Sequence, residues 1–135
     1  MPQPVLQTGL RTVRQVDQLR TGCTFDDQLS PSQVGTANNW AMIAAGSKHS
    51  LAIKTDGTLW SWGLNSDGQV GNGNNLNQLT PQMLGDGKNW KAISAGQFHS
   101  LAVRTDGTLW IWGRNLEGQL GDGKRQNLNA PFNLP

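Results

Sequence analysis

One fifteen-residue segment occurs twice in this chain, fifty positions apart. HSLAIKTDGTLWSWG at 49–63 returns as HSLAVRTDGTLWIWG at 99–113. The similarity extends further, because residues 35–84 align with residues 85–134 without a gap and with about half of the positions identical. Self-similarity at a fixed period of this length is the signature of repeat architectures. The chain is therefore expected to fold as copies of one unit.

Within each repeat, apolar and polar residues alternate with the period of two that is typical of β-strands. In the first repeat, residues 41–46 and 49–54 predict two strands. The Asp-Gly pair in TDGT at 55–58 is a strong hairpin signal, and the alternation resumes at 59–63. A loop rich in Gly and Asn follows, and residues 80–84 predict a fourth short strand.

Four antiparallel strands in every fifty residues, with Trp at the same places in each unit, are typical of a β-propeller blade. The sequence predicts an all-β protein with two such blades per chain. The residues that we assign to the structural repeat are Trp40, His49, Trp60, Trp62, Gly63, Trp90, His99, Trp110, Trp112 and Gly113.

The same alignment divides the chain into segments. Residues 35–84 form repeat 1 and residues 85–135 form repeat 2. Because QLSP within residues 28–34 resembles QLTP at 78–81, we expect 28–34 to be the outer strand of a preceding blade. Residues 1–27 are interpreted as a degenerate partial repeat or an N-terminal cap.

Two blades leave an apolar face uncovered at each end, and repeat arrays generally need three or more units. Three arrangements would cover these faces. Chains could assemble head to tail into a ring, the N-terminal segment could cap one face, or the chain could be part of a larger array. We expect a homo-oligomer or a piece of a larger array rather than a stable monomer.

The spaced pattern W..I.AG..HSLA...DG.L..WG.N..GQLG.G is almost intact in both repeats and resembles the repeats of the regulator of chromosome condensation. The resemblance covers residues 28–135 and implies a propeller, most often of seven blades, that acts as a binding scaffold rather than a catalyst. The founding member of this family is a nuclear exchange factor for the small GTPase Ran that also docks on nucleosomes. No functional residue is transferred, because neither repeat has an insertion that could supply the loops of the exchange factor.

Several residue patterns in the repeats resemble catalytic or metal-binding sites. His49-Ser50 and its counterpart could be a base and a nucleophile, but neighbouring strand residues point to opposite faces. We expect each His to be structural and to be held by backbone groups between strands. Asp56 and its counterpart are interpreted as turn residues, and Asp67 and Glu117 are too sparse for a calcium loop. The sequence predicts no catalytic, metal-binding or cofactor-binding residue.

The tryptophans allow two interpretations. Trp60, Trp62, Trp110 and Trp112 could stack bases or sugars, or they could pack between blades. Large aromatic side chains at fixed positions of a blade favour packing.

Positions that differ between the repeats are the candidates for partner contact, because loops vary on a constant scaffold. The differences cluster after the first strand, after the Trp-Gly pair and in the long loop. Aromatic and Arg side chains are enriched at the centres of interfaces. The predicted partner-contact residues are Phe98, Arg114, Lys124 and Arg125.

Composition narrows the class of partner. A net charge of +2 does not favour nucleic acid, which usually binds a clustered basic face. The sequence shows neither a signal peptide nor a membrane span, so we expect no membrane contact and a cytoplasmic location. The predicted function is a non-catalytic protein-interaction or structural module with an unknown protein partner. The alternative is a chromatin-associated, nucleic-acid-associated or GTPase-regulating factor, as the family resemblance implies.

Overall fold

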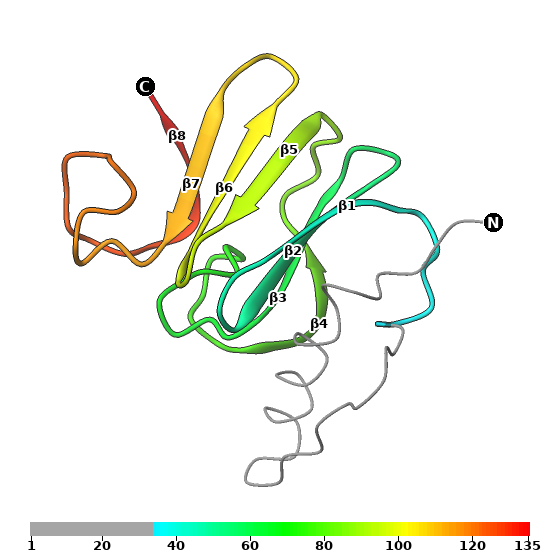
Figure 1. The fold of residues 1–135 in the computed structure, drawn as a ribbon, viewed down its shortest axis with the longest axis horizontal. Coiled ribbons are helices and arrows are strands. Elements are labelled where there is room, and N and C mark those ends of the chain that lie inside the picture. Colours follow the sequence, from blue (N-terminus) through cyan, green and yellow to red (C-terminus); the bar gives the residue numbers. More distant parts are fainter. Residues whose placement is uncertain (1–33) are drawn as a thin grey trace, which may run out of the picture.

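The structure, a computed structural model, describes residues 34–135 and shows eight β-strands in two four-stranded antiparallel sheets (Figure 1). In each sheet the strands follow one another in chain order. We call the sheet β1–β4 the first blade and the sheet β5–β8 the second blade. They coincide with the two repeats and confirm the predicted all-β class. The predicted N-terminal unit 1–27 lies outside the described residues, as does 28–34 apart from Val34.

The strands of the first blade are β1 (Trp40–Ala45), β2 (His49–Lys54), β3 (Leu59–Gly63) and β4 (Gln78–Met83). Those of the second blade are β5 (Trp90–Ala95), β6 (His99–Arg104), β7 (Leu109–Gly113) and β8 (Leu128–Leu134). Strand β4 begins at Gln78 rather than at the predicted Thr80. Within residues 34–135, no helix is long and apolar enough to cross a membrane.

The hairpin between β2 and β3 forms because Asp56 and Gly57 both suit a tight turn. Gly57 adopts a φ of 84°, in the left-handed region that favours glycine. Asp56 Oδ1 accepts hydrogen bonds from the backbone N–H of Thr58 at 3.0 Å and from its hydroxyl at 2.6 Å, and these bonds lower the pKa of Asp56. The resulting register places Ile53 opposite Leu59. The second blade repeats this turn and register.

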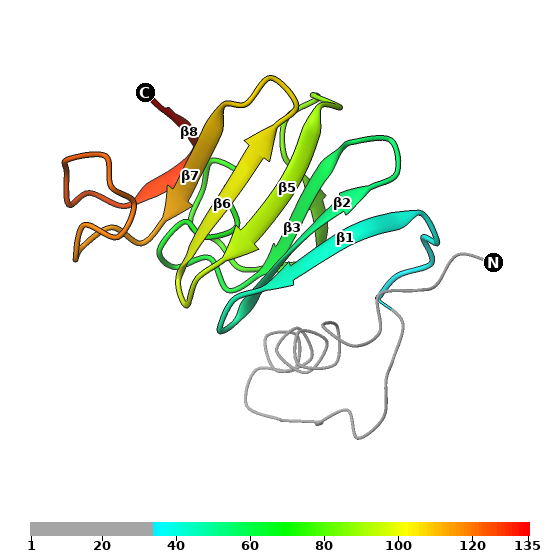
Figure 2. The same cartoon turned by 45° about the horizontal axis from the view of Figure 1, so that its top comes forward.

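The two blades pack against each other and bury a hydrophobic cluster between them (Figure 2). Leu51, Ile53 and Leu59 project from the first blade because alternate residues of β2 and the first residue of β3 face the same way. Fully burying a side chain of this size stabilises a fold by about 1.5–3 kcal/mol. The second blade contributes Trp90, Ala102 and Trp112, and Leu84 from the connection between the blades completes the cluster.

The opposite side of the second blade has no blade against it within residues 34–135. We define the open face by Leu101, Val103 and Leu109. Each of these side chains is only half-buried, whereas the residues fifty positions earlier are 0%, 4% and 0% exposed. The open face is part of an apolar hollow of about 290 Å³. The two blades therefore do not form a closed propeller.

Candidate functional site

Four residues form a hydrogen-bonded lock between the blades. The carbonyl oxygen of Gln69 accepts hydrogen bonds from the hydroxyl of Ser100 at 2.8 Å and from Nε1 of Trp112 at 2.9 Å. The Oγ of Ser100 also lies 2.9 Å from Nε2 of His49. None of the four residues is more than 1% exposed. His49 and Gln69 belong to the first blade, so this inter-blade lock joins consecutive repeats.

The lock also determines which nitrogen of His49 carries the proton and whether the ring is charged. The single hydroxyl proton of Ser100 goes to Gln69, so the Nε2–H of His49 donates to Oγ. Burial lowers the pKa of His49 to about 4, and the ring is neutral at pH 7. The sequence predicted a structural role for this histidine but a backbone partner. Nε2 meets a side chain of the next repeat, and a backbone hydrogen bond with His99 also acts on the ring and opposes the lowering of its pKa.

Two glycines leave room for the lock. A Cβ built on Gly46 would lie 2.2 Å from Cε1 of His49, and one on Gly71 would lie 2.5 Å from Nε1 of Trp112. Both distances are too short for real contacts. Gly46 therefore makes room for the His49 ring of its own blade, whereas Gly71 allows the close approach of the two blades.

The long loop after β3 is shaped from inside by Asn65, which is fully buried. Its Nδ2 donates to the carbonyl oxygens of Asn74 at 2.8 Å and Leu76 at 3.0 Å. Its Oδ1 accepts from the backbone N–H of Val70 at 2.9 Å. Asn115 holds the loop after β7 in the same way. An Asn in each repeat thus fixes the loops that carry the differing residues.

The loop after β3 reaches across to the outer strand of the second blade. The backbone N–H of Gly73 donates to the carbonyl of Asn129 at 2.7 Å. In return, Nδ2 of Asn129 lies 3.1 Å from the carbonyl oxygen of Gly73 and 3.3 Å from Oδ1 of Asn75. This loop contact is a further polar connection between the blades.

The tryptophans separate into two groups. Trp112 lies in the cluster between the blades, and Trp62 is also buried. Trp60 is half-buried, and Nζ of Lys54 lies 4.0 Å from its ring centroid. The second blade repeats this cation–π contact with an Arg. The faces of the half-buried rings are therefore occupied by cations of the same chain.

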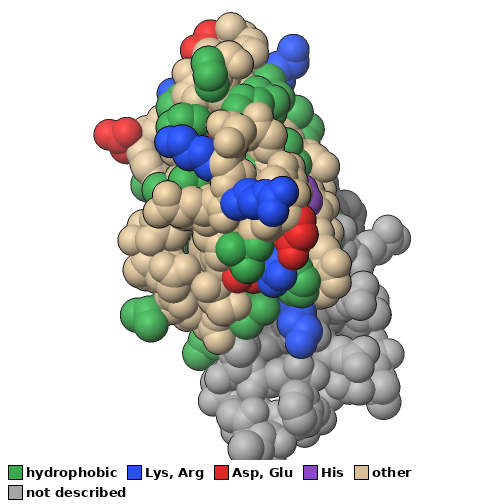
Figure 3. Space-filling model, turned by 90° about the vertical axis from the view of Figure 1, so that its left-hand side faces the viewer, with side chains coloured by type: hydrophobic (Ala, Val, Ile, Leu, Met, Phe, Trp, Pro, Cys, Tyr) green, Lys and Arg blue, Asp and Glu red, His purple; other side chains and the backbone are tan. Residues whose placement is uncertain are grey.

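The structure brings two of the predicted partner-contact residues together. The guanidinium carbon of Arg114 lies 5.6 Å from the ring centroid of Phe98. Glu117 binds Arg114 with two hydrogen bonds of 2.9 and 3.2 Å, and Asp67 lies 3.8 Å away. Basic and acidic side chains stand side by side on this end of the molecule (Figure 3). The Arg114 contact lowers the pKa of Glu117 to about 2.

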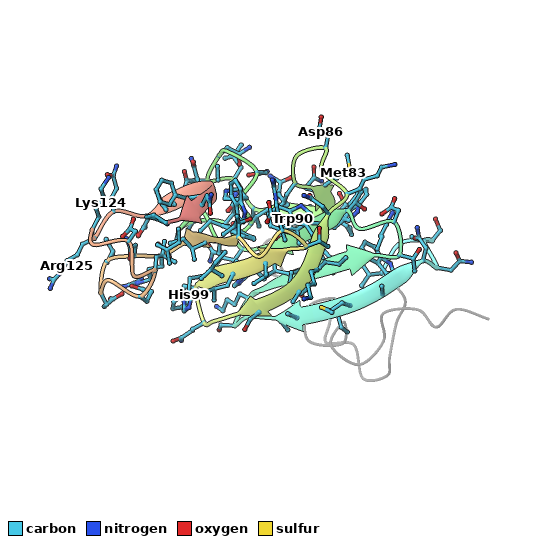
Figure 4. The ribbon with its side chains drawn as sticks, turned by 90° about the horizontal axis from the view of Figure 1, so that it is seen from above. Met83, Asp86, Trp90, His99, Lys124 and Arg125 are labelled. Carbon is cyan, nitrogen blue, oxygen red and sulfur yellow. The ribbon has the colours of Figure 1, made fainter. Side chains whose placement is uncertain are left out.

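Lys124 and Arg125 are not among the residues that line the hollow beside Phe98 and Arg114. Both are exposed and extend from the tip of the loop between β7 and β8, away from the strands (Figure 4). The four predicted contact residues therefore form two separate surfaces. Sequence analysis missed the pairing of Arg114 with Glu117, although a spacing of three residues between opposite charges was a signal for it.

Acidic residues of the turns and loops have partners within the chain. Asp56 is held in its turn by hydrogen bonds, and Glu117 is bound by Arg114. Asp122 accepts a hydrogen bond from Nδ2 of Asn115 at 2.9 Å. In the described part of the chain, no group of three or more His, Cys, Asp or Glu side chains could hold a metal ion.

The fold and the lock define a class of protein built from propeller blades joined repeat to repeat. Residues 56–103 and 106–135 match the Regulator of chromosome condensation (RCC1) repeat. A second form of the same repeat matches residues 90–119. The chain belongs to this family.

Individual relatives match over single stretches of the chain. The ultraviolet-B receptor UVR8 of Arabidopsis thaliana is 41% identical over 56 residues, which are 40% of this chain and 13% of the receptor. The probable E3 ubiquitin-protein ligase HERC3 of Homo sapiens is 39% identical over 56 residues, 40% of this chain and 5% of the ligase. The match thus spans a small part of each relative.

Solved structures share the fold. Prp20p of Saccharomyces cerevisiae, whose structure was described with its binding to Gsp1p and histones, has a TM-score of 0.72 at 24% identity. The match covers 84% of this chain and 30% of Prp20p. Human WBSCR16 has a TM-score of 0.70 at 26% identity, with 82% of this chain and 29% of that protein covered.

Proposed function

We propose that this chain is a non-catalytic propeller module that serves as a protein-interaction or structural scaffold and assembles head to tail into a ring. The observation that supports this most strongly is the open face. Its three side chains are only half-buried, whereas the equivalent side chains of the first blade are buried between the blades. Partly exposed apolar surface that is contiguous in this way marks interaction sites. Head-to-tail contacts form a closed ring when the rotation between neighbouring chains adds up to a full turn. With two blades per chain, three chains would give six blades and four chains would give eight.

Partner contact is proposed at the two surfaces that differ between the repeats. Phe98 and Arg114 offer an aromatic ring beside a guanidinium, next to a hollow of about 320 Å³. Glu117 already binds Arg114, so a partner with a carboxylate has to compete with it. Lys124 and Arg125 offer a second, exposed basic contact. The proposed partner is a protein with acidic side chains, and the proposed location stays cytoplasmic.

Native mass spectrometry of the full chain tests the ring. Three or four copies are expected, because either number completes a propeller of ordinary size. Single copies alone would contradict ring assembly. The contact surface is tested with the F98A/R114A double variant, with N133A as the control. If both bind a protein partner as the wild type does, the proposed surface is wrong.

A chromatin-associated or GTPase-regulating role is the second candidate. It is favoured by the likeness to Prp20p, which binds Gsp1p and histones. Binding of purified histones and of duplex DNA at about 50 and about 200 mM salt tests it. A measurable affinity for DNA that falls steeply with salt would favour this role. No binding to either probe would leave the scaffold as the better proposal.

A further inference from the structure

The loop after β3 contains the one Asn of the chain that is followed by Gly, at Asn72-Gly73. Gly has no side chain to hinder its backbone nitrogen, so this pair is well suited to attack of that nitrogen on the Asn side-chain amide. Asn72 is half-buried and Gly73 is exposed, so water reaches the pair. The loop after β7 carries Asp122-Gly123 at the equivalent place. The two loops thus differ here by the conversion of an amide to an acid.

Two N–H groups lie against the side-chain carbonyl of Asn72. Its Oδ1 accepts hydrogen bonds from Nδ2 of Asn65 at 3.1 Å and from the backbone N–H of Asn74 at 3.3 Å. Donors in these positions polarise a carbonyl and stabilise the negative charge that develops on its oxygen when a nucleophile adds. The carbonyl carbon Cγ of Asn72 is therefore activated as an electrophile by the loop itself.

The matching nucleophile, the backbone nitrogen of Gly73, is held by the second blade. Its N–H donates to the carbonyl oxygen of Asn129 at 2.7 Å, and Nδ2 of Asn129 donates to the carbonyl oxygen of Gly73 at 3.1 Å. While these bonds persist, the nitrogen keeps its proton and cannot turn toward Cγ of Asn72. Contacts of exposed loops open locally at a lower free energy than the whole fold does.

We propose that Asn72-Gly73 is a site of spontaneous deamidation that the contact with the second blade restrains. When the contact opens, the Gly73 nitrogen loses its proton to hydroxide and bonds to Cγ of Asn72. The Cγ–Nδ2 bond then breaks and ammonia leaves. Water cleaves one of the two ring carbon–nitrogen bonds of the resulting succinimide. Cleavage at Cγ gives Asp, and cleavage at the main-chain carbonyl carbon gives isoaspartate.

The two products affect the contact between the blades differently. Asp is already accommodated at this position of the repeat, because Oδ1 of Asp122 accepts hydrogen bonds from Nδ2 of Asn115 and from the backbone N–H of Lys124, both at 2.9 Å. Isoaspartate instead inserts a methylene group into the main chain directly before Gly73. The N–H and the carbonyl of Gly73 then cannot both keep their bonds to Asn129. Isoaspartate therefore loosens the loop contact, whereas Asp preserves it.

Two matched glycine variants of the full chain test the restraint. A Cβ on Gly68 would lie 2.7 Å from Cα of Asn129, so Gly68→Ala pushes that residue away from the loop. Gly118 has a similar φ, 76° against 81°, but its Cβ would meet nothing within 4 Å, so Gly118→Ala carries the backbone strain without the collision. Peptide mass spectrometry at mildly alkaline pH measures the conversion of Asn72. Conversion is expected to be about tenfold faster in Gly68→Ala than in Gly118→Ala. Equal rates would overturn the restraint.

The wild type provides a second comparison that needs no variant, and it decides the matter if Gly68→Ala does not fold. In urea the Gly73 nitrogen is free, so Asn72 is expected to convert about tenfold faster in the unfolded chain than in the folded chain. The same rate in both states would overturn the restraint. Absence of conversion in the unfolded chain would overturn the site itself.

The effect of the products is tested by urea unfolding. Asn72→Asp, which is the product of cleavage at Cγ, is expected to have the same midpoint in urea as the fresh wild type. Aged wild type, in which electron-transfer fragmentation shows isoaspartate at position 72, is expected to unfold at a lower urea concentration. Aged protein as stable as Asn72→Asp would overturn the predicted loosening.

Discussion

At the scale of single residues, His49 and His99 occupy the same position of the repeat but differ in burial and in hydrogen bonding, because only His49 has a blade packed against it. His49 is 1% exposed and donates to Ser100 of the next blade, while His99 is half-buried with no blade against it. The adjacent serine completes the pattern, because His and Ser of one repeat point to opposite faces and meet different neighbours. The His and the Ser of one repeat therefore contact different neighbours: His49 contacts the blade that follows, and Ser100 contacts the blade that precedes.

Ser100→Ala is expected to destabilise the chain by about 1–3 kcal/mol, because it leaves the buried Nε2–H of His49 without an acceptor. Urea unfolding followed by tryptophan fluorescence measures the effect. Ser66→Ala, at an exposed position, serves as the control and should change stability by about 0.5 kcal/mol or less. Equal stability of the two variants would show that the lock contributes nothing.

Stability is expected to fall as the pH is lowered from about 6.5 to about 4. The pKa of His49 is about 4 in the folded chain against 6.5 for an ordinary histidine, so the unfolded chain binds the proton first. Stability is complete above pH 6.5 and is lost toward pH 4, by about 2–3 kcal/mol. Burial lowers the pKa of His99 as well and adds in the same direction. Unfolding at pH 7 and pH 4.5 measures the loss, and His49→Gln should remove most of it. A wild type equally stable at both pH values contradicts the assignment.

At the scale of elements, the same loop has different neighbours in the two blades. Gly71 and Gly121 both have positive φ, 84° and 71°. A Cβ on Gly71 meets Nε1 of Trp112 at 2.5 Å, but a Cβ on Gly121 meets nothing within 4 Å. The loops differ in what covers them rather than in their backbone.

Gly121→Ala is expected to cost about 1–2 kcal/mol, the strain of a side chain at positive φ. Gly71→Ala should cost about 1–3 kcal/mol more, because its methyl group collides with the Trp112 indole. Urea unfolding of the two variants gives the difference directly, with backbone strain cancelled. The same cost for both would mean that the loop after β3 does not lie against Trp112.

The strands and hairpins could be predicted from the sequence because their signals are local. Alternation gave β2 and β3, and Asp-Gly gave the turn between them. The lock could not be predicted, because its acceptor is the main-chain carbonyl of Gln69, and a carbonyl has no signature in a sequence. The pairing of Arg114 with Glu117 depends on the loop conformation that Asn115 imposes, which is equally invisible in one sequence.

At the scale of the whole molecule, the two blades are alike in sequence and unlike in environment. The first blade is covered by the second through an apolar cluster, a hydrogen-bonded lock and a loop contact. The second blade presents the same apolar positions on its open face. Repeat proteins are stabilised by contacts between neighbouring units, so an end unit without a neighbour is the site where assembly adds most.

Urea unfolding of Leu51→Ala and Leu101→Ala, each in dilute and in concentrated protein, tests this account most directly. Leu51 is fully buried between the blades, so its loss should cost about 2–5 kcal/mol at both concentrations. Leu101 is half-buried on the open face, so its loss should cost about 1 kcal/mol or less in dilute protein and more once copies associate. A cost for Leu101→Ala equal to that of Leu51→Ala in dilute protein would contradict an open face. A cost that does not rise with concentration would contradict its role in assembly.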